Sequence, residues 1–194
     1  MKRIGIKVAL GLLAAAGLAI GGAQLLTANR KADAAASVDV NDRRLAEAGA
    51  YIARTGDCVA CHSVPNGKPF AGGLAMQTPV GTIYSSNITP DKQTGIGGYS
   101  YADFKNAVQH GIRKDGTPLY PAMPYPSYAI MPDADIQALY AYFMSQVEPV
   151  NQPSADSTIP WPLNMRWPMA WWQLLFAGKR EFAAPAGADE KLVR

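Results

Sequence analysis

Apolar residues recur at helical spacing in three stretches of the chain. The first begins after Asn41 or Asp42, either of which can cap a helix, and Gly56 ends it. Its apolar positions are Leu45, Ala48 and Ile52. Gly49 falls within this stretch, and it is either a tolerated glycine or a point where another helix approaches closely. This pattern predicts a helix that ends just before residue 58.

Two further helices follow after residue 99. Ser100 and Asp103 form a capping box for the second, which ends at Gly111. Its apolar face consists of Phe104, Val108 and Ile112. Pro132 suits the first turn of the third helix, which we expect to run to about Ser145. Its apolar face consists of Ile136, Leu139, Tyr140 and Phe143.

Two segments lack any such periodicity. Residues 63–98 show no sustained pattern, and the prolines in 118–126 predict a stiff, extended stretch. Structureless segments as long as 63–98 are uncommon in compact domains unless they serve a function. We therefore expect this one to wrap around a bound group.

The N-terminal residues form an uncharged run from Val8 to Leu26, preceded by Lys2, Arg3 and Lys7. The run has about the length that spans a bilayer, which predicts an uncleaved membrane anchor. The alternative is a cleaved export signal, with small-residue cleavage candidates at 32–36. Both place the rest of the chain outside the cytoplasm.

Length and composition indicate one domain with appendages. We assign 1–36 to the anchor or signal with its linker, 37–147 to the functional domain, and 148–194 to a strap and tail rich in proline and tryptophan. The net charge of +3 includes no dense basic stripe, so nucleic acid is not an expected partner.

The segment CVACH at 58–62 contains both cysteines and one of the two histidines. This spacing is typical of covalent haem attachment, in which Cys58 and Cys61 bond the haem vinyl groups and His62 binds the iron. A zinc site would need a second ligand pair, which His110 alone does not supply. A thioredoxin-like dithiol would need strands around it, which the pattern does not show.

A second axial ligand would complete the iron coordination. Met123 is the preferred candidate, because its proline-flanked segment can hold a thioether rigidly over the ring. Met131 is an alternative, although it adjoins the third helix, where it would serve as the N-cap. The remaining candidates are His110, Met76 and Met144.

The order of helix, CxxCH, long loop, helix, proline-flanked methionine and last helix resembles a class I cytochrome c. The segments GTIYSSNITPDKQTGIGGYSYADF, GIRKDGTPLYPAMPYPSY and WPLNMRWPMAWWQLLF are similar to the first haem domain of membrane-bound cytochrome c subunits of periplasmic alcohol, aldehyde and sugar-acid dehydrogenases. The resemblance covers about residues 40–182. It implies an all-α fold of three to five short helices around one covalent haem c. It also implies that Cys58 and Cys61 are thioether sites, that His62 and Met123 are axial ligands, and that the IYSSNITPD loop lies along the haem edge.

The resemblance further implies an electron carrier rather than an enzyme. The donor would be a quinoprotein, flavoprotein or molybdenum dehydrogenase, and the acceptor quinone, another cytochrome or a terminal oxidase. Those subunits usually carry three CxxCH motifs, and this chain carries one. We therefore expect either a natural single-haem relative or a piece of a longer protein.

Three alternatives stay open at this stage. The chain is an electron carrier, a haem enzyme or gas sensor with a labile sixth ligand, or an anchoring subunit of a dehydrogenase complex. The tail, with Trp161, Trp167, Trp171 and Trp172, packs on the domain, lies in the membrane interface or docks a dehydrogenase. In the interfacial case Arg166, Lys179 and Arg180 would meet lipid head groups. NIT at 87–89 reads as a turn, with a glycosylation acceptor as the weaker interpretation.

Overall fold

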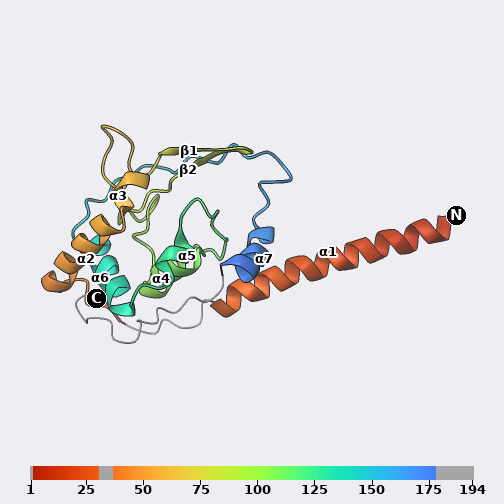
Figure 1. The fold of residues 1–194 in the computed structure, drawn as a ribbon, viewed down its shortest axis with the longest axis horizontal. Coiled ribbons are helices and arrows are strands. Elements are labelled where there is room, and N and C mark those ends of the chain that lie inside the picture. The colour runs from red at the N-terminus through yellow and green to blue at the C-terminus, as the bar shows by residue number, and fades with distance from the viewer. Residues whose placement is uncertain (1, 31–36, 178–194) are drawn as a thin grey trace, which may run out of the picture.

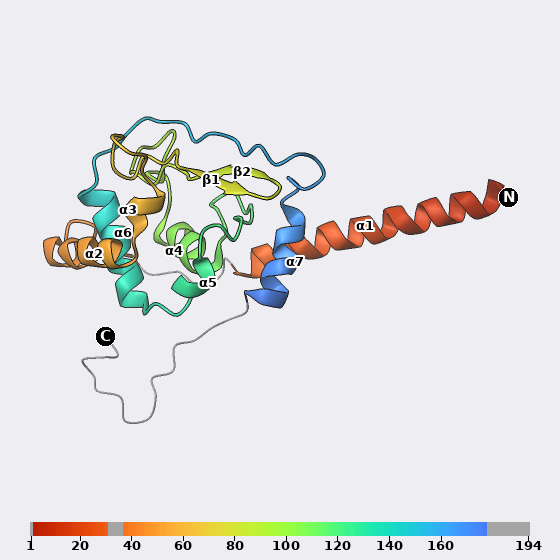
Figure 2. The same cartoon turned by 45° about the horizontal axis from the view of Figure 1, so that its top comes forward.

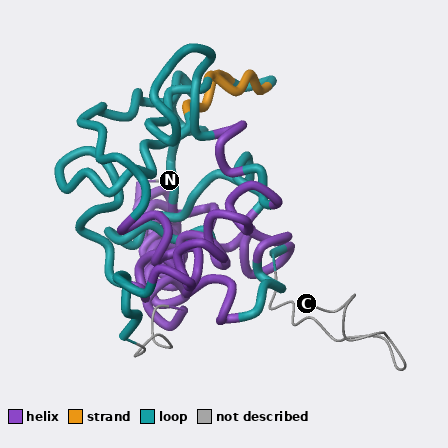
Figure 3. Tube along the Cα trace, turned by 90° about the vertical axis from the view of Figure 1, so that its left-hand side faces the viewer, coloured by secondary structure: helices purple, strands orange, loops and turns teal. Residues whose placement is uncertain are grey.

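A computed structural model describes residues 2–30 and 37–177 of the chain. This part is mainly helical, with one two-stranded hairpin, in agreement with the expected helical class (Figure 1). In chain order the elements are α1 (Lys2–Arg30), α2 (Arg43–Thr55), α3 (Cys58–Cys61), β1 (Ala75–Thr78), β2 (Gly81–Tyr84), α4 (Tyr101–His110), α5 (Tyr125–Tyr128), α6 (Asp133–Ser145) and α7 (Trp167–Phe176). The helices gather on one side of the domain and the loops cover the other (Figure 3).

Helix α2 begins where the sequence predicts, but it buries a different face. The side chain of Asp42 accepts hydrogen bonds from the backbone N–H groups of Arg44 and Leu45, and Gly56 is the C-cap. The fully buried positions are Ala46, Gly49 and Ala53. The predicted face is shifted by about one residue: Leu45 and Ile52 are half-buried and Ala48 is exposed. Small residues occupy the buried face because α2 packs tightly against α6 there.

Gly49 marks the closest approach of α2 and α6. A Cβ atom at this position would lie 1.9 Å from the carbonyl oxygen of Ala138 and 2.7 Å from Cβ of Tyr142. Only glycine leaves room for α6 at this crossing. The close-approach interpretation of Gly49 is therefore confirmed.

Helices α4 and α6 follow their predicted boundaries closely. Ser100 and Asp103 form the reciprocal capping box of α4, and Gly111 ends the helix in the left-handed conformation with φ of 63°. Pro132 is the N-cap of α6 rather than its first residue, so the expectation that Met131 serves as the N-cap is wrong by one position.

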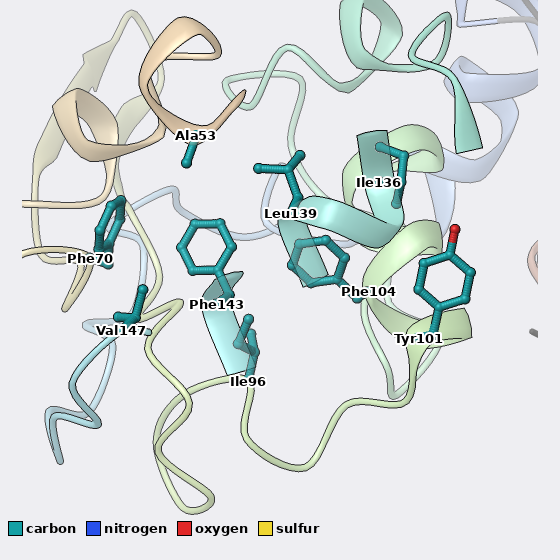
Figure 4. Close-up of a cluster of buried hydrophobic side chains, with 9 residues drawn as sticks. All are labelled: Ala53, Phe70, Ile96, Tyr101, Phe104, Ile136, Leu139, Phe143 and Val147. Atoms are coloured by element: carbon teal, nitrogen blue, oxygen red, sulfur yellow. The ribbon is translucent and has the colours of Figure 1, made fainter. Parts of the chain in front are cut away.

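Aromatic side chains from these helices form the core (Figure 4). Phe143 of α6 packs edge-on against Phe70, with ring centroids 5.1 Å apart, and it also contacts Phe104 of α4. Tyr140 continues the contact, because its ring lies 5.5 Å from that of Phe104 and 5.7 Å from that of Tyr101. The core therefore joins the long loop before β1 to α4 and α6.

Several short elements were not predicted, among them a hairpin and helix α5. Strands β1 and β2 form an antiparallel hairpin with Ala75 opposite Tyr84, within the segment that showed no periodicity. A strand of four residues is too short to show a clear alternation of apolar and polar residues in the sequence. Helix α5 begins at Tyr125, inside the segment predicted as extended, because Pro126 falls in its first turn, where no N–H donor is required.

Helix α1 projects away from the domain, and α7 lies alongside its C-terminal part (Figures 1 and 2). The indole N–H of Trp171 donates to the carbonyl oxygen of Ala19 at 3.0 Å. Among the residues that the structure describes, none of the helices is long and apolar enough to cross a membrane. The transmembrane interpretation of residues 8–26 stays a prediction, and the cleavage candidates at 32–36 lie outside the described residues.

Candidate functional site

Cys58 and Cys61 lie on α3, one turn apart, and both line a cavity in the domain. Asp57, with φ of 54°, turns the chain between α2 and α3. Both thiols are free. Burial raises the pKa of Cys58 to about 11, so this thiol is protonated at neutral pH. A reactive thiol is an accessible thiolate, so the protonated Cys58 is poorly suited to act as the nucleophile of a redox pair.

His62 is oriented by a single strong hydrogen bond. Its Nδ1 lies 2.7 Å from the carbonyl oxygen of Ser86. A carbonyl oxygen only accepts, so Nδ1 carries the hydrogen and Nε2 keeps its lone pair. Burial lowers the pKa of His62, which keeps the imidazole neutral at neutral pH. His62 also lines the cavity, so a neutral nitrogen donor is available to a metal there.

The cavity has a volume of about 710 Å³ and a mainly apolar lining. Its apolar wall includes Ile52, Ile88, Ile96, Phe104, Val108, Leu119, Leu139 and Phe143. Large apolar cavities with a few polar groups are typical of cofactor sites. Two thiols, a neutral imidazole and methionine sulfur at its wall match the donor set of a covalently bound haem. The residues of this chain therefore fit that group.

Three of the methionines weighed as the second ligand line the cavity: Met76, Met123 and Met131. Met131 is also packed against the core cluster, and Gln109 Nε2 donates to its carbonyl oxygen at 2.9 Å. Met123 lies in the loop before α5, where its carbonyl oxygen accepts from Tyr125 N at 2.8 Å. His110 and Met144 are not among the cavity-lining residues of the described chain.

The loop at 83–88 forms one wall of the cavity, the position that the resemblance implies. Asn87 within it is only 2% exposed. Its Nδ2 donates to Val150 O at 2.8 Å, Gln152 O at 3.1 Å and Thr94 Oγ1 at 3.1 Å. A buried, fully used side-chain amide explains NIT structurally and leaves no accessible glycosylation acceptor there.

The tail returns to the domain through α7 and the residues before it. Gln173 is buried, and its Nε2 donates to Gly111 O at 3.0 Å, while Arg166 reaches the cavity wall. Packing on the domain is therefore observed for part of the tail. Several apolar side chains remain exposed: Trp161, Leu163, Leu174, Leu175 and Phe176. Lys179 and Arg180 lie outside the described residues.

Sequence reasoning missed the polar groups on the cavity wall. Arg113 and Tyr120 line it together with Arg166, which comes much later in the chain. Arg166 was weighed as a lipid-contacting residue, and the structure places its guanidinium 3.4 Å from the centre of the Tyr120 ring instead. No local motif connects these residues, so only the folded chain reveals them.

Comparisons with known proteins give independent evidence on the family of this chain. The family model described as Cytochrome c matches residues 46–146. The chain is 59% identical over 160 residues to the gluconate 2-dehydrogenase cytochrome c subunit of Pantoea cypripedii, covering 82% of this chain and 36% of that protein. It is 54% identical over 154 residues to the cytochrome c subunit of the quinone alcohol dehydrogenase of Gluconacetobacter polyoxogenes, covering 79% and 33%.

A third relative, the fructose dehydrogenase cytochrome subunit of Gluconobacter japonicus, is 46% identical over 127 residues, covering 65% of this chain and 26% of that protein. The chain thus spans about a third or less of the length of these curated relatives.

Proposed function

The chain belongs to the cytochrome c family, and we propose that it carries single electrons from a periplasmic dehydrogenase to quinone, another cytochrome or a terminal oxidase. The observation that carries this proposal is the meeting of Cys58, Cys61, His62 and Met123 at one apolar cavity. Bound haem supplies reversible one-electron chemistry at its iron. A carrier of this kind is not itself an enzyme, and it serves as a subunit of an oxidoreductase complex.

The side chains have distinct tasks in this proposal. Cys58 and Cys61 would hold the single haem c covalently, and Ser86 fixes His62 with the Nε2 lone pair free to bind the iron. Met123 would supply its thioether sulfur as the second iron ligand, which would raise the reduction potential and leave no iron position for a substrate. The apolar wall excludes water.

The dehydrogenase donor is supported by the relatives, whose names specify gluconate, alcohol and fructose dehydrogenases. Dehydrogenases of the quinoprotein, flavoprotein or molybdenum type can all pass single electrons to a cytochrome. Co-purification tests this part. The native protein is extracted in mild detergent, followed by its haem absorbance, and its companions are identified by mass spectrometry. A dehydrogenase subunit in fixed ratio supports the assignment as a dehydrogenase subunit, whereas a cytochrome that elutes alone or with oxidase subunits contradicts that assignment and favours a membrane-tethered shuttle.

We also propose that residues 1–30 attach the protein to the inner membrane, with the haem domain in the periplasm. Support comes from the projecting helix α1, whose exposed apolar side chains include Leu10, Leu12, Leu13 and Leu18. Replacing residues 1–30 with a cleavable export signal should move the cytochrome from the membrane pellet to the soluble periplasmic fraction. A native protein already soluble there would contradict the tether and favour a cleaved leader.

A further inference from the structure

The two axial ligands of the proposed function lie on segments that are far apart in the chain. His62 follows directly on α3, whereas Met123 precedes α5 by two residues, and both line the cavity. A side chain binds a metal firmly only when neighbouring contacts hold it in the productive geometry. Met123 therefore needs contacts that fix its segment relative to the haem-attachment motif.

Tyr128, the last residue of α5, makes such a contact. Its hydroxyl donates to Gly56 O at 2.9 Å, a hydrogen bond between residues 72 positions apart. Gly56 is the C-cap of α2 and comes two residues before Cys58. The hydrogen bond thus joins the short helix after Met123 to the turn that leads into the first haem cysteine.

The ring of Tyr128 also lies beside the attachment site. A Cβ atom placed on Gly56 would be 3.7 Å from Cys58 Sγ and 3.9 Å from Cε1 of Tyr128. Tyr128 is half-buried and lines the cavity. Burial is the main cause that raises the pKa of Tyr128, so its hydroxyl keeps its proton and donates at neutral pH.

The other end of α5 is anchored to α4. Tyr125 is only 1% exposed, and a Cβ atom at Gly111 would lie 2.5 Å from its Cδ1 atom, so its ring packs directly on the C-cap of α4. Its backbone N–H donates to Met123 O at 2.8 Å. A helix of four residues has little stability of its own, so contacts at its two ends determine where it lies.

We propose that Tyr128 is a positioning residue for the second iron ligand. Its hydrogen bond to Gly56 holds the Met123 segment at the distance from the haem-attachment turn at which the thioether reaches the iron. This inference rests on the proposed function, because it requires haem in the cavity and Met123 as the ligand. Without the hydroxyl, α5 is held at one end only, so the thioether should leave the iron more often and an external ligand should compete more easily.

The test compares Tyr128→Phe with Tyr140→Phe in the haem-loaded protein. Tyr140 is the matched control, because its partly buried hydroxyl also donates to a backbone carbonyl, Tyr99 O at 3.0 Å. Tyr140 is not among the cavity-lining residues of the described chain. Titration gives the affinity of the ferrous protein for carbon monoxide, and the sulfur-to-iron charge-transfer band reports methionine ligation in the ferric protein. Urea unfolding gives the stability of each variant.

Tyr128→Phe should raise the apparent affinity for carbon monoxide about threefold to tenfold, the factor that one net hydrogen bond contributes, and it should weaken the charge-transfer band. Tyr140→Phe should keep the affinity and the band of the wild type, although both variants lose a comparable amount of unfolding free energy. In a Met123→Ala background, Tyr128→Phe should leave carbon monoxide affinity unchanged, because no thioether is left to displace.

An unchanged carbon monoxide affinity in Tyr128→Phe would overturn this inference and leave the electron-carrier proposal intact. An effect that persisted in the Met123→Ala background would also overturn it, because Tyr128 would then act without Met123. Absence of covalent haem from the wild type would instead overturn the proposed function.

If Tyr128→Phe fails to retain haem, a ring-fluorinated tyrosine at position 128 decides. Its hydroxyl is a stronger hydrogen-bond donor, because the fluorine withdraws electrons from the ring. The affinity for carbon monoxide should then fall below that of the wild type, and an affinity equal to the wild type would overturn the inference.

Discussion

The hydrogen bond from His62 to Ser86 links the haem-binding motif to the loop at 83–88 that forms one wall of the cavity. The backbone reinforces this link, because Gly72 N donates to His62 O at 2.8 Å. Together they hold both the backbone and the imidazole of His62 in place. Such orientation is what a metal-binding histidine requires, since a freely rotating ring would lose affinity for the iron.

Met123 should determine the reduction potential. We expect Met123→Ala to lower the midpoint potential by about 0.1 V or more, since axial ligand identity spans roughly 0.8 V across haem proteins. The ferrous variant should also bind carbon monoxide, because one axial position becomes open. Redox titration and carbon monoxide difference spectra measure both effects.

Met131→Ala is the matched control for this prediction, because Met131 lines the same cavity but is packed against the core. It should leave the potential and the carbon monoxide response close to wild type. The reverse pattern would assign the ligand to Met131. If neither variant changed carbon monoxide binding, a haem enzyme or gas sensor with a labile sixth ligand would become the better account of the chain.

At the scale of residues, the sequence predicts site residues that are contiguous in the chain and misses those that only the fold brings together. Cys58, Cys61 and His62 occupy five positions, and their spacing alone indicates haem attachment. Tyr120 and Arg166 meet only because the tail folds back against the loop before α5. Neither residue belongs to a sequence motif that indicates haem binding. Tyr120 lies in a proline-rich segment and Arg166 in a tryptophan-rich one.

The α2–α6 crossing is the most tightly packed contact between elements. We expect Gly49→Ala to destabilise the domain by about 2–3 kcal/mol, because the added methyl overlaps the Ala138 backbone, which is not free to move. Denaturant unfolding of the haem-loaded protein measures this loss.

Gly98→Ala serves as the control for the crossing. A Cβ at Gly98 would meet only the end of the flexible Lys114 side chain, at 3.4 Å. Its unfolding free energy should stay within about 0.5 kcal/mol of the wild type, as for most surface substitutions. Equal stabilities of the two variants would mean that α2 and α6 can separate without cost.

Asp133 at the start of α6 should make the stability of the domain depend on pH. Burial opposes its ionisation, but hydrogen bonds from Lys105, Tyr101 and Gln137 outweigh burial and lower its pKa from 3.8 to about 2. A lowered carboxyl pKa stabilises the fold above the unfolded-state value, and the contribution disappears as pH falls through the folded-state value. The window is therefore about pH 4 down to pH 2.

Asp133→Asn should cost about 1 kcal/mol or less at neutral pH, because the side chain is half exposed. Urea unfolding at several pH values should show the two proteins converging between about pH 4 and pH 2. Asp135→Asn removes the same charge from the same helical turn and is the control. A difference from wild type that stayed constant down to pH 2 would show that ionisation of Asp133 is not responsible.

At the scale of elements, caps and periodicity predicted α2, α4 and α6 correctly. Side-chain size does not predict the buried face of α2, because the tight crossing with α6 selects the small residues Ala46, Gly49 and Ala53. The hairpin was not predicted, because its strands are only four residues long. Helix α5 was not predicted, because proline favours both extended chain and first helical turns.

At the scale of the whole molecule, residues 148–160 connect α6 to α7 across the cavity loop (Figure 2). A buried polar cluster of Asn87, Thr89 and Thr94 holds this strap. Val150 N donates to Thr89 Oγ1 at 3.1 Å, and Gln152 N donates to Thr94 Oγ1 at 2.9 Å. The strap keeps the loop that carries Ser86 in place, and it also leads the chain to Arg166.

The last prediction concerns Asn87, the centre of this cluster. Asn87→Ala removes donors to Val150 O and Gln152 O and the acceptor for Thr89, so buried polar groups lose their partners. We expect a loss of about 2–4 kcal/mol in unfolding free energy. Hydrogen exchange at the amides of residues 150 and 152 should accelerate.

Asn151→Ala provides the control for Asn87, because Asn151 lies in the same strap and its Nδ2 donates to Gln93 Oε1 at the surface. It should change the unfolding free energy by less than about 0.5 kcal/mol. Loosening of the strap should also reach the haem, because Ser86 and His62 lie next to Asn87. We therefore expect Asn87→Ala, and not Asn151→Ala, to shift the midpoint potential. An unchanged potential in a destabilised Asn87→Ala protein would show that the strap stabilises the fold without positioning His62.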